Sequence, residues 1–237
     1  MSSIRYPFVD ALRGVAIVLM MAYHFTFDLD YFHVVDIDFN NNAFWLFARS
    51  LIVSMFLGLV GISLYLASVN GVDKRRYWRR IGVLLGCALA VSLASYLMFP
   101  KSLIFFGILH FIVIGSLLGV LFLRFYWVNL LLGCGFIAAG LWIHHPLFDQ
   151  SALQWIGLMT HKPVTEDYVP LFPWFGVVLL GLFLGRSIYS GPVPSFACWR
   201  CNTTIGRVLT VGGRHSLIIY MLHQPLFIGI LYLFLSG

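Results

Sequence analysis

The first apolar segment of the chain carries the ionisable side chains best placed to do chemistry. These are Asp10, Arg13, His24 and Asp28. At 100° per residue all four fall on one face of a helix. Arg13 and His24 are eleven residues apart, which corresponds to a net rotation of about 20° and a rise of about 16 Å. Because ionisable groups inside apolar segments are costly, this face is a candidate functional site.

His24 and Asp28 are four residues apart, so the spacing predicts a hydrogen bond from the imidazole to the carboxylate. Such a bond would fix the tautomer and raise the basicity of the ring, as a general base requires. The structural alternative is that Asp10 and Arg13 anchor a helix end, and that His24 is a satisfied buried polar group. We favour a function because all four residues share one face.

Two more polar side chains lie inside apolar segments at a matching depth. Counted along a helix, Arg49 is about five residues and His110 about seven residues from the outer end of its segment. With His24, they would lie about 7–11 Å below the outer surface. We expect these three side chains to line one outward-facing cavity. Each alone is more often a hydrogen-bonding group inside a bundle.

The last apolar segment begins R-H-S-L-I-I-Y-M-L-H-Q-P at 214–225. Ser216, Tyr220 and His223 are spaced four and three apart and share a helix face. Pro225 is expected to bend the helix after His223 and to free carbonyl groups there. This face suits either a polar tunnel or a set of hydrogen bonds between helices.

Arginines at the ends of the predicted helices are candidates for binding phosphate, because the guanidinium fork suits phosphate oxygens. They are Arg13, Arg186, Arg207 and Arg214. The basic segment K-R-R-Y-W-R-R at 74–80 is interpreted instead as a topology signal that attracts anionic lipid.

On the outer side, D-Y-V-P-L-F-P-W at 167–174 indicates a rigid interfacial turn. Asp167 and Trp174 could face a sugar-like molecule there, although Trp174 also suits a simple interfacial anchor. The outer histidines match no metal-ligand spacing. Cys198 and Cys201 form a CxxC without a second half, so we expect ordinary thiols and no metal site.

The composition indicates what kind of protein holds these residues. Of 237 residues, 60% are apolar and 10% are charged, and the mean hydropathy is +0.91. This excludes a soluble enzyme, a disordered chain and a disulfide scaffold. The sequence predicts one membrane-embedded domain over residues 1–237. The net charge of +6 is assigned to one side of a membrane and not to nucleic acid.

Apolar stretches of near 20 residues predict an all-α bundle of about seven transmembrane helices. They run over residues 8–29, 44–68, 80–99, 103–123, 126–144, 170–188 and 215–235. Twelve of the fifteen Lys and Arg residues fall on one side, which places the N-terminus in the cytoplasm and the C-terminus outside. GxxxG at 82–86, 115–119 and 181–185 predicts close helix packing.

Four motifs resemble one family. V-D-A-L-R-G-V-A-I-V-L-M-M-A-Y-H-F at 9–25 resembles the opening helix of the heparan-alpha-glucosaminide N-acetyltransferase catalytic-domain family, especially its short bacterial members. F-G-I-L-H-F-I at 106–112, Y-V-P-L-F-P-W-F-G at 168–176 and H-S-L-I-I-Y-M-L-H-Q-P at 215–225 fit the same family. The resemblance covers nearly the whole chain in order.

Arg13, ten residues and His24 also resemble the Arg-x10-His motif of the wider transmembrane acyltransferases that modify surface polysaccharides. That resemblance implies that Arg13 and His24 are essential, that acyl-coenzyme A is the cytoplasmic donor and that the sugar lies across the membrane. The lysosomal branch carries a luminal histidine and an asparagine where this chain has His24, and His33 does not match that spacing. No glucosaminide specificity follows.

The leading hypothesis is a membrane acyltransferase that uses acetyl-coenzyme A as co-substrate. An acyl group would pass to a hydroxyl or amine of a carbohydrate or glycolipid (the acyl acceptor) at the outer face. The donor phosphates would bind Arg13, Arg207 and Arg214. His24, oriented by Asp28, would be the base, and His110 or Arg49 would polarise the thioester carbonyl. The predicted binding set also includes Asp10, Asp167, Trp174, Ser216, Tyr220 and His223.

Three alternatives stay open. A proton-coupled transporter or flippase could use the same cavity, a haem protein could use His24 and His110 as axial ligands, and a structural subunit would need neither. Direct transfer and an acyl-histidine intermediate are both compatible with the sequence. A bacterial inner membrane rests on the resemblance, and a homo-oligomer stays open.

Overall fold

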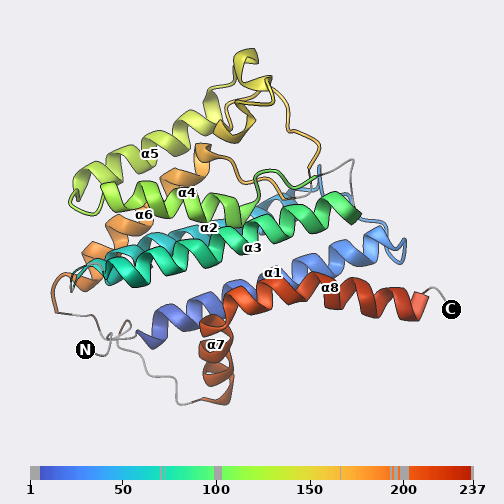
Figure 1. Ribbon diagram of the computed structural model, residues 1–237, viewed down its shortest axis with the longest axis horizontal. Helices are drawn as coiled ribbons and strands as arrows, with labels where there is room; N and C mark the ends of the chain where they lie inside the picture. The colour runs from blue at the N-terminus through green and yellow to red at the C-terminus, as the bar shows by residue number, and fades with distance from the viewer. Residues whose placement is uncertain are drawn as a thin grey trace. The chain divides into compact units, whose positions relative to one another are not determined.

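The protein is built from helices. The computed structural model describes residues 6–69, 71, 73–98, 103–165, 167–192, 194, 197 and 203–235. In that part of the chain there are eight α-helices and two short 3-10 helices and no strand (Figure 1). They are α1 (Pro7–Tyr31), α2 (Ala43–Ser68), α3 (Lys74–Met98), α4 (Ile108–Leu121), α5 (Trp127–Trp142), η2 (Pro146–Asp149), η3 (Gln154–Ile156), α6 (Leu171–Tyr189), α7 (Thr204–Arg214) and α8 (Ser216–Leu235).

Five of these helices, α1, α2, α3, α6 and α8, are long and apolar enough to cross a membrane. The other two apolar helices, α4 and α5, have 14 and 16 residues. At 1.5 Å per residue they extend about 21 and 24 Å, whereas the hydrocarbon core is about 30 Å thick. The prediction of an all-α multi-pass membrane protein is confirmed. The count of seven spans and the orientation of the termini stay predictions.

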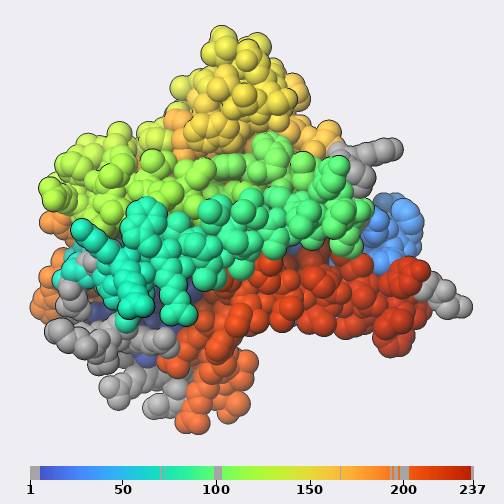
Figure 2. All heavy atoms as spheres, in the orientation of Figure 1, coloured from blue at the N-terminus to red at the C-terminus, as the bar shows by residue number. Residues whose placement is uncertain are grey.

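The helices form two compact units. The terminal unit comprises Met1–Phe56 and Val193–Gly237, and the central unit comprises Leu57–Pro192. In the terminal unit α8 runs alongside α1, and α7 stands across them (Figure 1). The space-filling view shows α8 open along its length (Figure 2). Its exposed side chains are apolar, Leu222 and Leu233 among them, so we assign this face to lipid.

Helix α7 is an amphipathic helix that the apolar count did not predict. Thr203 caps it, because the Thr203 hydroxyl oxygen accepts a hydrogen bond from the Gly206 amide at 3.3 Å. Its backbone lies directly against α1. A Cβ on Gly213 would lie 1.7 Å from the Asp10 carbonyl oxygen, and a Cβ on Gly14 would lie 2.0 Å from the Leu209 carbonyl oxygen. This contact therefore requires glycine on both helices.

In the central unit, one GxxxG motif makes a close contact between helices and another does not. A Cβ on Gly181 would lie 2.3 Å from the Gly58 carbonyl oxygen, so α6 packs closely on this part of α2, as predicted. Around Gly82 and Gly86 of α3 there is open space for a Cβ. The motif at 82–86 therefore makes no close helix contact within the described residues.

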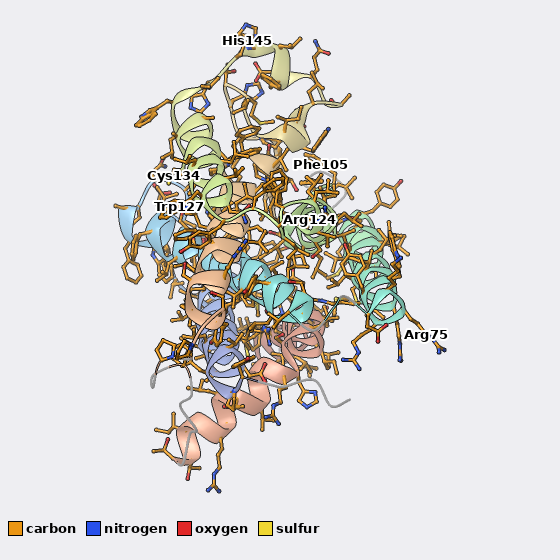
Figure 3. All side chains as sticks on the ribbon, turned by 90° about the vertical axis from the view of Figure 1, so that its left-hand side faces the viewer. Arg75, Phe105, Arg124, Trp127, Cys134 and His145 are labelled. Carbon is orange, nitrogen blue, oxygen red and sulfur yellow. The ribbon has the colours of Figure 1, made fainter. Side chains whose placement is uncertain are left out.

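The basic segment 74–80 is helical, since α3 begins at Lys74 and not at the predicted residue 80. Lys and Arg are good helix formers, and Asp73 provides the cap. The Asp73 carboxylate accepts a hydrogen bond from the Arg76 amide at 3.1 Å. Arg75, at this end of α3, extends its side chain away from the helix (Figure 3).

Candidate functional site

The predicted cytoplasmic end of the terminal unit holds one carboxylate between two arginines. Arg13 Nη1 lies 2.6 Å from Asp10 Oδ1, and Arg214 Nε lies 3.4 Å from Asp10 Oδ2. Asp10 is buried, whereas the Arg13 and Arg214 side chains are 27% and 40% exposed. The structure therefore brings together Arg13 and Arg214, both predicted for the donor phosphates, and Asp10 of the predicted binding set. Together they carry one net positive charge, which suits an anion.

Arg207 is exposed on α7, seven residues before Arg214. That spacing is about two helical turns, so both side chains leave the same face of α7. Arg186 has a structural role in the central unit, because its Nη1 donates to the Arg124 carbonyl oxygen at 3.0 Å. Arg207 therefore stays a candidate phosphate ligand, and Arg186 does not enter the proposed site.

Toward the other end of α1, the imidazole of His24 is held by its own helix. Nδ1 of His24 lies 2.9 Å from the Met20 carbonyl oxygen. A carbonyl oxygen can only accept, so Nδ1 carries a proton, and in the neutral ring Nε2 holds the lone pair. His24 thus has the tautomer that a general base needs. The Met20 backbone fixes it.

A second histidine, from α8, meets this ring. His223 is buried, and its Nδ1 lies 2.6 Å from the Tyr220 carbonyl oxygen, so its Nε2 also holds a lone pair. The centroids of the His24 and His223 rings are 4.9 Å apart, and the rings are nearly perpendicular. The pairing of these two imidazoles was not predicted, because residues so far apart in sequence give no sign of contact.

The predicted hydrogen bond between His24 and Asp28 is wrong. Asp28 Oδ1 instead accepts a hydrogen bond from Gln224 Nε2 at 3.1 Å. The spacing allowed the predicted bond, but the His24 ring turns back to the Met20 carbonyl and Gln224 of α8 reaches Asp28. Asp28 therefore does not orient the base through a hydrogen bond to its imidazole. Gln224 is a site residue that sequence reasoning missed, although it directly follows His223.

The remaining site candidates of the terminal unit surround the two histidines. The Tyr220 ring centroid is 5.6 Å from that of His223, and Tyr220 packs on the core of Ile17, Met20 and Ile52. Ser216 is half-buried on the same helix. Arg49 of α2 is also half-buried and acts electrostatically on Tyr23, whose ring centroid lies 5.8 Å from that of His24.

In the central unit, His110 is engaged at both ring nitrogens. Gly107 N donates to Nδ1 at 3.3 Å, so Nε2 carries the proton and donates to Ser92 Oγ at 3.1 Å. Ser92 Oγ in turn donates to the Ile104 carbonyl oxygen at 2.6 Å. His110 thus holds the segment before α4. Because neither nitrogen is available to a thioester carbonyl in this arrangement, we do not include His110 in the proposed chemistry.

Asp167 also supports the start of α4. Its Oδ2 accepts a hydrogen bond from the Ile108 amide at 2.9 Å, and a Cβ on Gly107 would lie 2.4 Å from that oxygen. These contacts explain why α4 begins at Ile108 and not at the predicted residue 103. Trp174 is half-buried on α6. Its predicted contact with an acyl acceptor stays a prediction.

The segment between α5 and α6, together with residues just before α4, forms a hollow of about 530 Å³. Phe105, Gln154, His161 and Lys162 are part of its lining. Figure 3 labels Phe105, and it labels His145 at the top of the view, shortly after the end of α5. No group of three His, Cys, Asp or Glu side chains in the described residues could hold a metal ion. Cys198 and Cys201 lie outside the described residues.

Comparison with known proteins identifies the family. The family model described as heparan-alpha-glucosaminide N-acetyltransferase, catalytic, matches residues 5–225. No curated protein and no solved structure matches the chain significantly. The matched region contains Arg13, His24 and His223. With its five candidate spans, the protein is a membrane protein of an acetyltransferase family, and it belongs to the heparan-alpha-glucosaminide N-acetyltransferase catalytic family.

Proposed function

We propose that the protein transfers an acetyl group from acetyl-coenzyme A to a hydroxyl or amine of a carbohydrate or glycolipid. The observation that carries this proposal is the state of His24. Its Nδ1 proton is held by the Met20 carbonyl, which leaves the Nε2 lone pair for a proton from the acyl acceptor. The imidazole lies on the same continuous helix as Arg13.

The donor side of the proposal rests on the cluster of Asp10, Arg13 and Arg214. The cluster carries one net positive charge, and its two guanidinium side chains are partly exposed. The cluster therefore suits the phosphates of coenzyme A, with Arg207 as a further ligand. The rise from Arg13 to His24, about 16 Å along α1, is a length that the pantetheine arm can span. The arm would then bring the thioester to His24.

The reaction that we propose at His24 balances as follows. The acceptor oxygen or nitrogen attacks the thioester carbonyl and gives its proton to His24 Nε2. The carbon–sulfur bond breaks, and the coenzyme A thiolate takes the proton from Nε2 and leaves as a thiol. Arg49 is the candidate for stabilising the developing oxyanion. A route through an acetyl group on Nε2 uses the same lone pair.

We further propose that α4 and α5 cross the membrane as short spans, which gives seven crossings. The distribution of basic residues then favours a cytoplasmic N-terminus and an external C-terminus. In this topology the segment 143–170 is external. Its hollow, together with Asp167 and Trp174, is where a carbohydrate or glycolipid would approach. A bacterial inner membrane is the location that the family resemblance suggests.

The test is the release of free thiol from acetyl-coenzyme A by the detergent-purified protein with a panel of sugars and amino sugars. His24→Gln should lower the transfer rate about 10²–10⁴-fold, because Gln cannot take the proton. The matched control is His33→Asn, since His33 is exposed with φ 58°, a conformation that Asn adopts readily. Full transfer by folded His24→Gln would contradict the proposal.

Binding of the donor is tested separately by isothermal titration of acetyl-coenzyme A. We expect Arg13→Ala to abolish binding and His24→Gln to retain it, because Arg13, unlike His24, is assigned to the phosphates. If neither free coenzyme A nor acetyl-coenzyme A binds the folded wild-type protein, the donor site is wrong.

A further inference from the structure

Asp28 and the half-buried Gln224 form a pair in which one oxygen of each side chain lacks a hydrogen-bond partner within the described residues. Asp28 is 2% exposed, and its Oδ1 accepts a hydrogen bond from Gln224 Nε2 at 3.1 Å. The other oxygen of each side chain, Asp28 Oδ2 and Gln224 Oε1, is buried without a hydrogen-bond partner in the described part of the chain. Buried polar atoms in proteins almost always have such a partner.

An ionised Asp28 does not explain this arrangement. A carboxylate oxygen and an amide oxygen are both acceptors, so neither can satisfy the other. In the same helix, Asp10 is paired with two arginines. Asp28 has no basic side chain within ion-pair distance in the described residues, and a buried charge without a partner is costly. The ionisable side chains that are linked to His24 through ring contacts or electrostatics are Tyr23 of α1, Arg49 of α2, and Tyr220 and His223 of α8.

One proton on Asp28 Oδ2 satisfies both atoms. A protonated carboxyl group gains an O–H donor, and Gln224 Oε1 is the acceptor that this donor needs. The two side chains then exchange two hydrogen bonds, Gln224 Nε2–H to Oδ1 and Oδ2–H to Oε1. We propose that Asp28 is a neutral carboxylic acid in such an acid–amide pair, and that the pair positions His24 and His223.

The position of the pair supports this role. Asp28 is one turn after His24 on α1, and Gln224 directly follows His223 on α8. Two hydrogen bonds between the same side chains fix the two helices in rotation and in translation, next to imidazoles whose centroids are 4.9 Å apart. Asp28 and Gln224 are therefore positioning residues. Only this positioning role depends on the proposed function of His24.

Substitutions at Asp28 separate the acid–amide pair from an ionised carboxylate. Asn has the same shape as Asp, and its amide exchanges two hydrogen bonds with Gln224, whereas Ala makes neither. We expect Asp28→Asn to keep the unfolding temperature of the purified protein within about 1 °C and Asp28→Ala to lower it by about 3–10 °C. Equal losses in both variants would overturn the proposal, because Asn would then not replace the neutral acid.

Infrared spectroscopy observes the proton directly. In the difference spectrum between wild type and Asp28→Asn at neutral pH, we expect the C=O stretch of a protonated carboxyl group, shifted in D2O. Carboxylate bands in its place would show that Asp28 is ionised and would overturn the proposal. Neither measurement needs a substrate. The proposed proton on Asp28 and the proposed acyl transfer can therefore each be contradicted without contradicting the other.

The positioning role is tested by exchanging the partners. The double variant Asp28→Asn, Gln224→Glu places the acid on α8 and the amide on α1. With an acyl acceptor in hand, we expect Asp28→Ala to lower kcat more than KM, and the exchanged pair to restore most of the kcat that Ala loses. Failure of a folded exchanged pair to restore kcat would overturn the positioning role.

Discussion

The chemistry that we propose at His24 depends on a backbone atom. The residue types Arg13, His24 and His223 stand out in the sequence because polar groups in apolar segments are rare. The partners of the two histidines do not stand out. The Met20 carbonyl that fixes the His24 tautomer would be present whatever residue occupied position 20. The Asp28–Gln224 contact joins side chains 196 residues apart. The sequence alone therefore singled out His24 as a candidate base, which stays a prediction, and assigned it the wrong hydrogen-bond partner.

A residue outside the predicted spans gives a pH prediction. The Thr160 amide and hydroxyl donate to the Asp149 carboxylate, each at 2.8 Å, and these hydrogen bonds hold the pKa of Asp149 below its ordinary value of 3.8. Because the folded pKa is the lower one, Asp149 stabilises this segment above pH 3.8 and loses that contribution as the pH falls through the folded pKa.

We therefore expect the Thr160 amide to exchange hydrogen faster, relative to its intrinsic rate, once the pH falls below about 4. Thr160→Val removes the hydroxyl donor but keeps the amide. This variant should begin to lose protection at a higher pH than the wild type does. Protection that is constant across this pH range would show that the Asp149 contacts do not hold the segment.

At the scale of elements, apolar runs predicted where helices lie better than where they begin. The predicted run 215–235 closely matches α8. Helix α4 begins later than predicted, because Asp167 and His110 support a start that only the folded chain brings together. Helix α3 begins earlier, and the Asp73 cap was a signal that the sequence did contain. Helix α7 was missed because its glycines argue against a helix, although their absent side chains allow its contact with α1.

Adjacent glycines of α7 test this contact. A Cβ on Gly213 would lie 1.7 Å from the Asp10 carbonyl oxygen, whereas a Cβ on Gly212 would meet nothing within 4 Å. Gly213→Ala should therefore force α7 away from α1 and lower stability by about 2–4 kcal/mol. It should also weaken acetyl-coenzyme A binding, because Arg214 would move away from Asp10.

Gly212→Ala is the matched control. Alanine favours a helix over glycine by up to about 1 kcal/mol, so this variant should be at least as stable as the wild type. Denaturant unfolding of both variants is the measurement. If the two behaved alike, α7 would not be in contact with α1 through Gly213.

For the whole molecule, the composition identifies a membrane protein, but it leaves the number of membrane crossings open. A chain with 10% charged residues and several long apolar helices is a membrane protein. The helices α4 and α5 are short for a bilayer, so length alone does not place them across it. Residues 122–126 join these two helices. The side of the membrane on which they lie depends on whether α4 crosses it.

Cysteine labelling decides between these topologies. In a variant without its native cysteines, Arg124→Cys should react with a membrane-impermeant maleimide only from the cytoplasmic side, because seven crossings place residue 124 there. His145→Cys should react only from the outside. Both native side chains are exposed (Figure 3). External labelling at both residues 124 and 145 would mean that α4 and α5 do not both cross.

The pairing of α1 with α7 and α8 also bears on how the chain is made. Asp10 meets Arg214 across 204 residues of sequence, and Asp28 meets Gln224 across 196. During synthesis α1 therefore enters the membrane long before either partner leaves the ribosome. While the central helices are added, the carboxyl groups of Asp10 and Asp28 lie in lipid, in water or beside the insertion machinery, before Arg214 and Gln224 are available to them. The last two helices thus supply the side chains that pair with α1. The candidate site can assemble only at the end of translation.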